Sequence, residues 1–549
     1  MSRRLSACRG LRRALQLAFL AAFVLLFALA AYPLKAPVPV DLFLRADPLL
    51  ALSAMISLRR LILPLLWYAL PLVVLSLLLG RVFCGWACPM GTVLDICERL
   101  FRVQARPRAH APQWSRAKFY VLIGLLVTML LPAAHRAKQE VALSQSVGLS
   151  AVYLADPMAL LTRTLTWAGL PAVQYVFTFG RDTATAWAYS PLVERHPTLA
   201  RALSPVQFGL SRAARPVYFR TGLLTFAIFA AIVALGRYAP RFWCRNLCPL
   251  GALLALLGKA SPFRLAVSDR CTPCMRCANE CKMGAIGEEP HRYAGPECIG
   301  CFTCLAVCPE GAVSLTLGHQ RTGRDDAVRL DRRRVLQAVG LGVAAVVLPK
   351  VDWRTSRSAA TEGVLKISSE RLIRPPGARA EEEFVTACVR CGECMKVCPT
   401  NALQPALGEG GLEALATPIL VPRIGPCSQP CNLCGRVCPT SAIGAFSVAE
   451  KAHLYLGTAR VDRSTCIAWA ADRQCLICQE ACPYAAISQT LVGGVGKPVV
   501  DERICVGCGM CEWVCPVEPL GAIRVCSAGD RRHLTREAQR RLWEEPTSP

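Results

Sequence analysis

The sequence has 549 residues, of which 53% are hydrophobic and 18% charged, and its formal net charge is +25. This length gives room for several domains, and the hydrophobic content is high for a water-soluble chain. The 31 cysteines do not fit a secreted disulfide scaffold, because such scaffolds are short. The arginines cluster next to apolar runs, a pattern that is typical of membrane topology signals rather than of nucleic-acid binding.

The N-terminal part, residues 1–260, predicts an α-helical polytopic membrane domain. Five arginines precede an apolar run over residues 14–32, which is close to the ~20 residues of a spanning helix. A cleaved signal peptide is the alternative. Three further apolar runs would alternate in direction: residues 61–80, 119–134 and 221–236. The positive-inside rule then places the N-terminus in the cytoplasm, and residues 135–220 would form an outer segment with pieces at the membrane interface.

A two-cysteine motif occurs twice, each time directly after an apolar run. Residues 81–94 read RVFCGWACPMGTVL, and residues 241–254 read RFWCRNLCPLGALL. Both C-x3-C-P units would lie at the cytoplasmic face, where four thiols could hold a metal or a further cluster. This candidate additional site consists of Cys84, Cys88, Cys244 and Cys248. The alternative is a structural turn whose cysteines are small buried residues.

Residues 261–318 predict a small α+β domain like a bacterial ferredoxin, with two [4Fe–4S] clusters. Two runs with the spacing C-x2-C-x2-C-x3-C cover residues 271–281 and 298–308. In such runs three close thiolates bind one cube, and the fourth binds the partner cube. The predicted ligand sets are Cys271, Cys274, Cys277 with Cys308, and Cys298, Cys301, Cys304 with Cys281. Zinc is the alternative, although zinc sites usually pair two C-x2-C hooks across a longer gap.

Residues 319–378 predict a signal or anchor followed by a linker. Three arginines at 332–334 open an apolar segment that ends at Leu348, the pattern of a twin-arginine export signal. The segment is short for a span, and the small residues 358–360 resemble a cleavage site. A buried core helix with a basic start is the alternative. Export would place the rest of the chain in the periplasm.

Residues 379–527 predict a second ferredoxin domain with four [4Fe–4S] clusters, followed by a polar tail over residues 528–549. Each of its four cysteine quartets ends in Cys-Pro, as the ferredoxin run does. The spacing does not indicate which quartets exchange their fourth cysteine. The quartets are Cys388, Cys391, Cys394, Cys398; Cys427, Cys431, Cys434, Cys438; Cys466, Cys475, Cys478, Cys482; and Cys505, Cys508, Cys511, Cys515.

With these motifs in place, residues 1–318 resemble the NapH-type polytopic ferredoxins, and residues 331–526 resemble the NapG-type exported four-cluster ferredoxins. The chain looks like a fusion of the two. The resemblance implies a multi-pass protein of the bacterial cytoplasmic membrane with six clusters. It also implies that the protein oxidises quinol from the membrane quinone pool. The electrons would pass to a periplasmic redox partner, such as a cytochrome or a nitrate-reductase-type system.

The alternative function is a non-enzymatic electron relay or maturation factor that supplies reductant to a partner metalloenzyme. Quinol oxidation releases two protons and requires a carboxylate or histidine within reach. Asp156, Glu140 and His135 are candidates because they are ionisable groups beside apolar segments. An ordinary interfacial role is the alternative for each of them.

Overall fold

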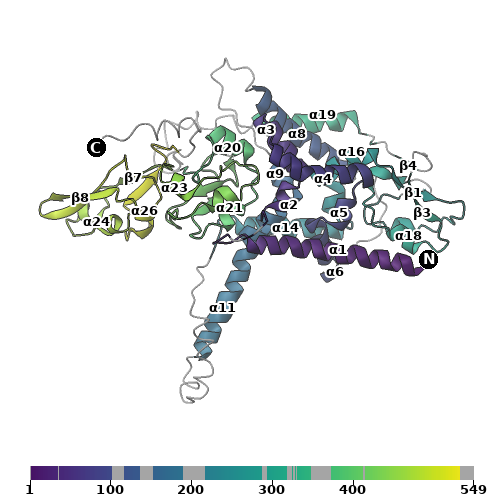
Figure 1. Cartoon of the computed structure of the whole chain (residues 1–549), viewed down its shortest axis with the longest axis horizontal. Helices are drawn as coiled ribbons and strands as arrows, with labels where there is room; N and C mark the ends of the chain where they lie inside the picture. The colour runs from purple at the N-terminus through teal and green to yellow at the C-terminus, as the bar shows by residue number, and fades with distance from the viewer. Residues whose placement is uncertain are drawn as a thin grey trace.

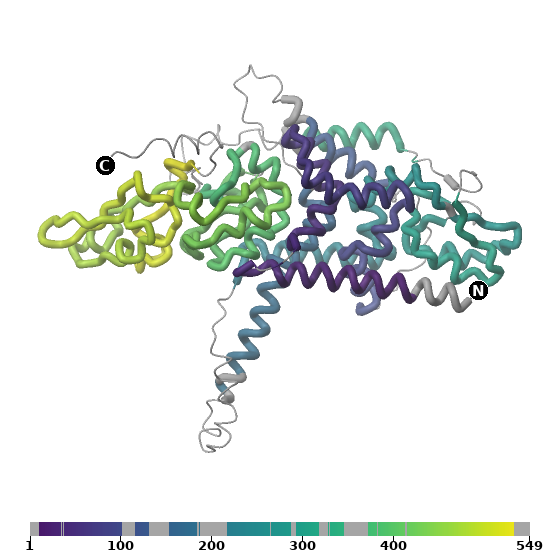
Figure 2. Tube along the Cα trace, in the orientation of Figure 1, coloured from purple at the N-terminus to yellow at the C-terminus, as the bar shows by residue number. Residues whose placement is uncertain are grey.

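The computed structural model describes residues 2–34, 36, 38–101, 116–135, 152–188, 217–286, 293–317, 324–325, 328, 330–347, 372–411 and 414–531. These residues form three parts along the longest axis of the molecule (Figure 1). A helical bundle lies in the middle. The N-terminal ferredoxin, residues 263–317, lies at one end, and the C-terminal array, residues 372–531, lies at the other (Figure 2).

Five apolar helices form the frame of the bundle. They are α1 (Ser2–Leu29), α4 (Leu63–Leu79), α8 (Ala117–His135), α14 (Gly222–Ala234) and α19 (Arg332–Val347). Shorter elements lie between them: α2 (Leu42–Arg45), α3 (Pro48–Leu58), α5 (Val82–Trp86), α6 (Pro89–Leu100), α9 (Val152–Ala155), α10 (Pro157–Thr164), the π-helix η1 (Leu165–Gly169), α11 (Leu170–Ala188), η2 (Leu235–Arg237), α15 (Phe242–Asn246), α16 (Pro249–Leu257) and η3 (Gly258–Ala260).

The predicted apolar runs therefore form helices, but most of these helices are short. Within the described residues, only Gly10–Leu29 of α1 is long and apolar enough to cross a membrane unaided. The other apolar helices have 10–17 residues, and 17 residues span about 25 Å against a hydrocarbon core of about 30 Å. The helical content is confirmed, whereas the polytopic membrane domain stays a prediction.

Helix α19 lies along α8, and glycines allow the two backbones to approach closely. A Cβ on Gly342 would lie 2.6 Å from the carbonyl oxygen of Gly124. Any side chain at position 342 would therefore push the two helices apart. The opposite face of α19 is open, because Leu336 and Leu341 are 71% and 72% exposed. The arginine-led segment is thus a peripheral helix of the bundle, and the alternative of a buried core helix is wrong. The residues near the predicted cleavage site lie outside the described residues.

The N-terminal ferredoxin has the α+β form that its motif predicts. Strand β1 (Phe263–Val267) pairs antiparallel with β3 (Val313–Leu317), so the start and end of the domain lie side by side. A short helix lies within each cysteine run, and a small parallel strand pair completes the domain. These elements are α17 (Arg276–Asn279), β2 (Tyr293–Ala294), η4 (Gly295–Glu297), α18 (Thr303–Val307) and β4 (Arg324–Asp325).

The C-terminal array contains three antiparallel strand pairs and several one-turn helices. The pairs are β5 (Leu403–Pro405) with β6 (Pro418–Leu420), β7 (Thr458–Val461) with β10 (Ile523–Cys526), and β8 (Ile487–Val492) with β9 (Val495–Val500). The helices are α20 (Glu381–Ala387), α21 (Glu393–Lys396), α22 (Leu433–Arg436), α23 (Val448–Lys451), α24 (Ile467–Ala470), α25 (Ile477–Glu480) and α26 (Met510–Val514).

The array is docked on the end of the bundle that lies farthest from the N-terminal ferredoxin. Lys396 Nζ donates to the carbonyl oxygens of Phe27 and Ala30 at the C-terminus of α1, the latter at 2.8 Å. These carbonyls have no partner within their own helix. A second contact is the ion pair of Arg220 with Glu409 at 2.8 Å, whose arginine is 37% exposed. The chain's first helix and its last domain are therefore joined directly.

We expect Lys396→Met to loosen this docking more than Arg220→Ala. A hydrogen bond to a charged donor contributes about 1.5–3 kcal/mol, whereas a partly exposed ion pair contributes about 0–1 kcal/mol. Hydrogen exchange of residues 388–398 in the purified protein should therefore accelerate clearly in the first variant and little in the second. Equal exchange in both would show that the lysine does not hold the array in place.

Candidate iron–sulfur centres

Two cavities of the N-terminal ferredoxin are lined by the cysteines that the motif groups together. One is lined by Cys271, Cys274, Cys277 and Cys308. The other is lined by Cys281, Cys298, Cys301 and Cys304. Each cavity thus has three cysteines from one run and the fourth from the other run. The structure brings together both predicted sets, while their ligation to iron stays a prediction.

The C-terminal array repeats this exchange, which the spacing alone could not assign. One cavity is lined by Cys505, Cys508, Cys511 and Cys482, and a neighbouring one by Cys466, Cys475, Cys478 and Cys515. In the first two quartets, the pKa shifts indicate the same arrangement, in which the fourth cysteine of one quartet lies near the first three of the other. Burial raises the pKa of Cys394, and its neighbours Cys391, Cys388 and Cys438 raise it further. Burial likewise raises the pKa of Cys434, beside Cys427, Cys431 and Cys398.

The fourth cysteine of a quartet usually accepts a backbone hydrogen bond from the segment that follows it. The amide of Ala285, for example, donates to Cys281 Sγ at 3.3 Å. Hydrogen bonds to the sulfurs are one of the means by which a protein sets a cluster's reduction potential. The same bond, at 3.3–3.4 Å, reaches Cys308, Cys438, Cys482 and Cys515.

The two halves of the array meet between their second and third sites. The amide of Cys427 donates to the carbonyl oxygen of Cys508 at 2.8 Å. Burial raises the pKa of Cys508 to about 12, and the Cys427 thiol adds to this effect. The four sites therefore follow one another through the array, with the site of Cys388, Cys391 and Cys394 on the bundle side.

The two C-x3-C-P units also meet, at the end of the bundle beside the N-terminal ferredoxin. Their cysteines are buried, with 5–9% of their surface exposed, and none forms a disulfide. Burial raises the pKa of Cys248, and the thiols of Cys244, Cys84 and Cys88 raise it further. Cys248 Sγ accepts the amide of Gly251 at 3.3 Å, as the fourth cysteines of the ferredoxin sites do.

Two arginines cross between the units in a nearly symmetric way. Arg241 Nη1 donates to the carbonyl oxygen of Cys84 at 2.8 Å, and Arg81 Nη2 donates to that of Cys244 at 3.3 Å. The glycine of each motif makes room for the arginine of the other copy, because a Cβ on Gly251 would lie 2.7 Å from Arg81 Nη2. The shared arginine and glycine of the sequence repeat are therefore explained by one interlocked structure.

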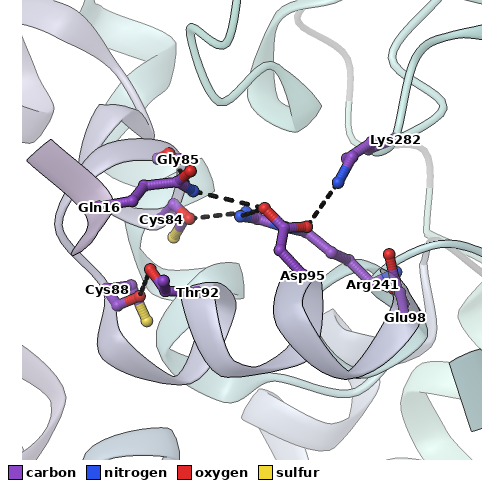
Figure 3. Close-up of polar contacts among 9 residues, drawn as sticks. All are labelled: Gln16, Cys84, Gly85, Cys88, Thr92, Asp95, Glu98, Arg241 and Lys282. Atoms are coloured by element: carbon purple, nitrogen blue, oxygen red, sulfur yellow. Dashed lines mark hydrogen bonds and ion pairs between the residues drawn. The ribbon is translucent and has the colours of Figure 1, made fainter. Parts of the chain in front are cut away.

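Each arginine is held by a carboxylate. Asp95 accepts from Arg241 Nε at 2.9 Å and Nη2 at 2.7 Å, and Lys282 Nζ lies 2.6 Å from its other side (Figure 3). Burial alone would raise the pKa of Asp95, but Arg241 and Lys282 hold it well below its ordinary value. Arg81 Nη1 donates to Glu297 at 3.1 Å, and Lys118 contacts the same carboxylate.

No three histidine, cysteine or acidic side chains within the described ranges lie close enough to hold a single metal ion. This holds for the ferredoxin quartets and for the four thiols of the bundle alike. Thiolates of a cube bind four different irons, whereas those of a zinc site bind one ion.

A buried pair of carboxyl groups lies at the other end of the bundle. Asp47 caps α3 and Asp156 caps α10, and neither is more than 1% exposed. Asp47 Oδ2 and Asp156 Oδ1 have no donor among the described residues. Burial raises the pKa of both groups, that of Asp156 to about 6, because the uncharged form is favoured away from water. We infer that the two groups share a proton.

Sequence reasoning proposed Asp156 but missed its partner. The tripeptide Ala-Asp-Pro occurs at residues 46–48 and again at residues 155–157, and this repeat is the signal that could have revealed the pair. Of the other two candidates, Glu140 lies outside the described residues. His135 ends α8, and its side chain is not among those described.

Comparison with known proteins supports the iron–sulfur assignment. A family described as "4Fe-4S binding domain" matches residues 62–107 and again 221–268. Two families described as "4Fe-4S dicluster domain" match residues 297–403 and 473–518. The ferredoxin-type protein NapG of Escherichia coli is 34% identical over 203 residues, which cover 34% of this chain and 82% of the relative. The chain belongs to the NapG and MauM family of ferredoxin-type proteins.

Two further relatives extend this family assignment. The methylamine utilization ferredoxin-type protein MauM of Paracoccus denitrificans is 40% identical over 164 residues, covering 28% of this chain and 71% of the relative. The ferredoxin-type protein NapF of Escherichia coli is 32% identical over 152 residues, covering 27% of this chain and 84% of the relative. No solved structure matches. As a family member with several such domains, this chain is an iron–sulfur electron-transfer protein, and the fusion to a NapH-type membrane part stays a prediction.

We expect Asp95→Asn to destabilise the bundle by about 3–5 kcal/mol, because it leaves the buried Arg241 guanidinium without a counter-charge. Lys282→Met is the matched control, since Lys282 contacts the same carboxylate but is 28% exposed, and its loss should cost at most about 1 kcal/mol. Denaturant unfolding of the detergent-purified protein measures both values. Similar losses in the two variants would contradict a dominant role of the arginine.

Asp156 should make stability depend on pH. Its folded-state pKa of about 6 exceeds the ordinary value of about 3.9, so the folded state binds the extra proton between these values. Stability is therefore full below about pH 4 and decreases as the pH rises to about 6. Asp156→Asn keeps the helix cap and should flatten this slope, whereas Asp472→Asn, at a largely exposed carboxylate, should leave it unchanged. Unfolding free energies measured from pH 4 to 7 test this, and an unchanged slope in Asp156→Asn would contradict it.

Proposed function

We propose that the chain is a membrane-anchored quinol dehydrogenase component that passes electrons to a periplasmic redox partner. The observation that carries this proposal is the placement of cluster-type thiol sets at both ends of an apolar helical bundle. The 24 cysteines of the six quartets would hold six [4Fe–4S] clusters, which supply one-electron carriers. Such carriers suit the stepwise removal of two electrons from a quinol.

The outer surface of the bundle supports membrane anchoring. Large apolar side chains are exposed along four of its helices, which is unfavourable in water and favourable in lipid. Examples are Leu25 of α1 at 59%, Leu78 of α4 at 53%, Leu223 of α14 at 83% and Leu341 of α19 at 72%. Embedding the bundle among lipid chains would cover all of them at once, and local thinning of the bilayer accommodates short helices.

Helix α11 supports the same orientation. It projects from the junction of bundle and array, across the direction of α1 (Figure 1). Val173, Val176 and Phe177 are 64–69% exposed along it. A helix with exposed apolar residues that runs across the spanning direction suits the membrane interface. The predicted interfacial pieces of residues 135–220 would then lie at the outer face.

The ends of the helices suggest the topology. Gly80 at the end of α4 lies near Ser261, and Lys118 at the start of α8 contacts Glu297, so both ends are beside the N-terminal ferredoxin. The end of α1 and the start of α14 lie at the array instead, through Lys396 and through Arg220, which pairs with Glu409. With the arginine-rich N-terminus inside, the N-terminal ferredoxin would be cytoplasmic and the array periplasmic.

The carboxyl pair is our candidate for the proton acceptor. Asp156 lies beside Arg163, which in turn lies near Cys391 of the array. Tyr153 Oη donates to the carbonyl oxygen of Thr386 at 3.4 Å, directly before the first array quartet. A quinol that delivers electrons to this quartet would thus have a buried base near the point of electron transfer.

Anaerobic mixing of the purified protein with a short-chain quinol tests the proposed activity. The visible absorption of the clusters should bleach, and Asp156→Asn should slow the bleaching on the order of 10²-fold at unchanged iron content. Asp472→Asn is the control. Bleaching by dithionite but not by quinol would leave the electron relay as the function and remove the dehydrogenase.

Protease added to intact spheroplasts tests the topology. We expect digestion of the C-terminal array alone, because the N-terminal ferredoxin would be shielded by the membrane. Antibodies against residues 263–317 and 372–531 follow the two parts separately. Protection of both parts until lysis would show that α19 does not cross and that the array is cytoplasmic.

A further inference from the structure

The four thiols of the bundle have no role in the six-cluster proposal. Each copy of the repeated motif brings only two of them, Cys84 and Cys88 or Cys244 and Cys248, whereas a cube requires four thiolates. The crossed arginines fix the two copies against each other so that the pairs meet. A cluster at this place would have to be shared between the copies.

The charges around the thiols favour a bound anionic group. Arg81 and Lys118 face one carboxylate, Glu297, and Arg241 and Lys282 face another, Asp95. Arg12 and Arg245 add two further cations beside these groups and Glu98 adds one carboxylate, so the cations remain in excess. Arg81 and Arg241 are only 1% exposed. Buried charge without compensation is costly. A [4Fe–4S]²⁺ core on four thiolates carries a net charge of about −2, which would offset this surplus, whereas four neutral thiols would not.

The site borders the N-terminal ferredoxin and shares a buried core with residues of the array. Its four cysteines share one buried core with Ile299 of the N-terminal ferredoxin and Cys391 of the array. Trp86, two residues after Cys84, donates from Nε1 to the carbonyl oxygen of Gly300 at 2.9 Å. Gly300 stands next to Cys301, which lines the nearer ferredoxin cavity.

We propose that Cys84, Cys88, Cys244 and Cys248 together hold a seventh [4Fe–4S] cluster that links the N-terminal ferredoxin to the C-terminal array. The cluster would take one electron from one neighbour and give one electron to the other, with no bond made or broken. Only the link depends on the proposed function and topology. The presence of the cluster does not.

The first test counts clusters in the full-length, anaerobically purified protein. Native mass spectrometry of the unmodified holoprotein should show seven cubes, and a mass for six would overturn the proposal without any substitution. The double variant Cys88→Ser/Cys248→Ser should lose about four irons per chain and one paramagnetic signal. Cys97→Ser/Cys526→Ser, at two cysteines outside all quartets, should lose neither. A double variant with full iron and an unchanged spectrum would also overturn the proposal.

The second test addresses the link separately. The protein is placed in liposomes with the N-terminal ferredoxin facing an enclosed low-potential reductant, and reduction of the array is followed by its absorption. The wild type should transfer electrons, and Cys88→Ser/Cys248→Ser should be slowed at least tenfold. Equal rates would overturn the link. If the protein contains seven clusters and the double variant transfers electrons more slowly, but quinol is not oxidised, only the dehydrogenase function is refuted.

Discussion

The crossed contacts of Arg81 and Arg241 are the constraint on which the arrangement of the bundle depends. Each arginine leaves its own copy of the motif and binds the backbone of the other, and each is anchored by a carboxylate. One of these carboxylates, Glu297, belongs to the N-terminal ferredoxin, and the other, Asp95, is also bound by that domain's Lys282. The same contacts therefore join two halves of the bundle and seat a ferredoxin domain on them. Guanidinium groups suit this role because their donors are fixed in one plane and remain charged when buried.

Cysteine spacing predicted the ferredoxin parts well, because cluster ligation ties the sequence directly to geometry. The exchange of the fourth cysteine within residues 271–308 followed from the motif, whereas the partners in the array became visible only once the chain was folded. The apolar runs gave the positions of α1, α4, α8 and α14. The runs over residues 119–134 and 221–236 are about as short as the apolar parts of α8 and α14, so the limited length of these helices was already visible in the sequence.

The sites between the parts were the hardest to predict. Asp47 and Asp156 are 109 residues apart in the chain, and each by itself reads as an ordinary helix cap before proline. Only the packing of the folded bundle makes them a buried pair. Likewise, the surplus positive charge near the four thiols depends on lysines and carboxylates from separate segments. Local sequence patterns do not indicate such contacts between distant segments.

The bond of Lys396 to the end of α1 has a consequence for biogenesis. The first helix to leave the ribosome keeps open carbonyl groups until a lysine 366 positions later reaches them. That lysine ends α21, between Cys394 and Cys398, two of the cysteines that are proposed to hold a cluster. If these cysteines hold the proposed cluster, the end of the oldest helix is completed only once one of the youngest segments has folded around its cofactor.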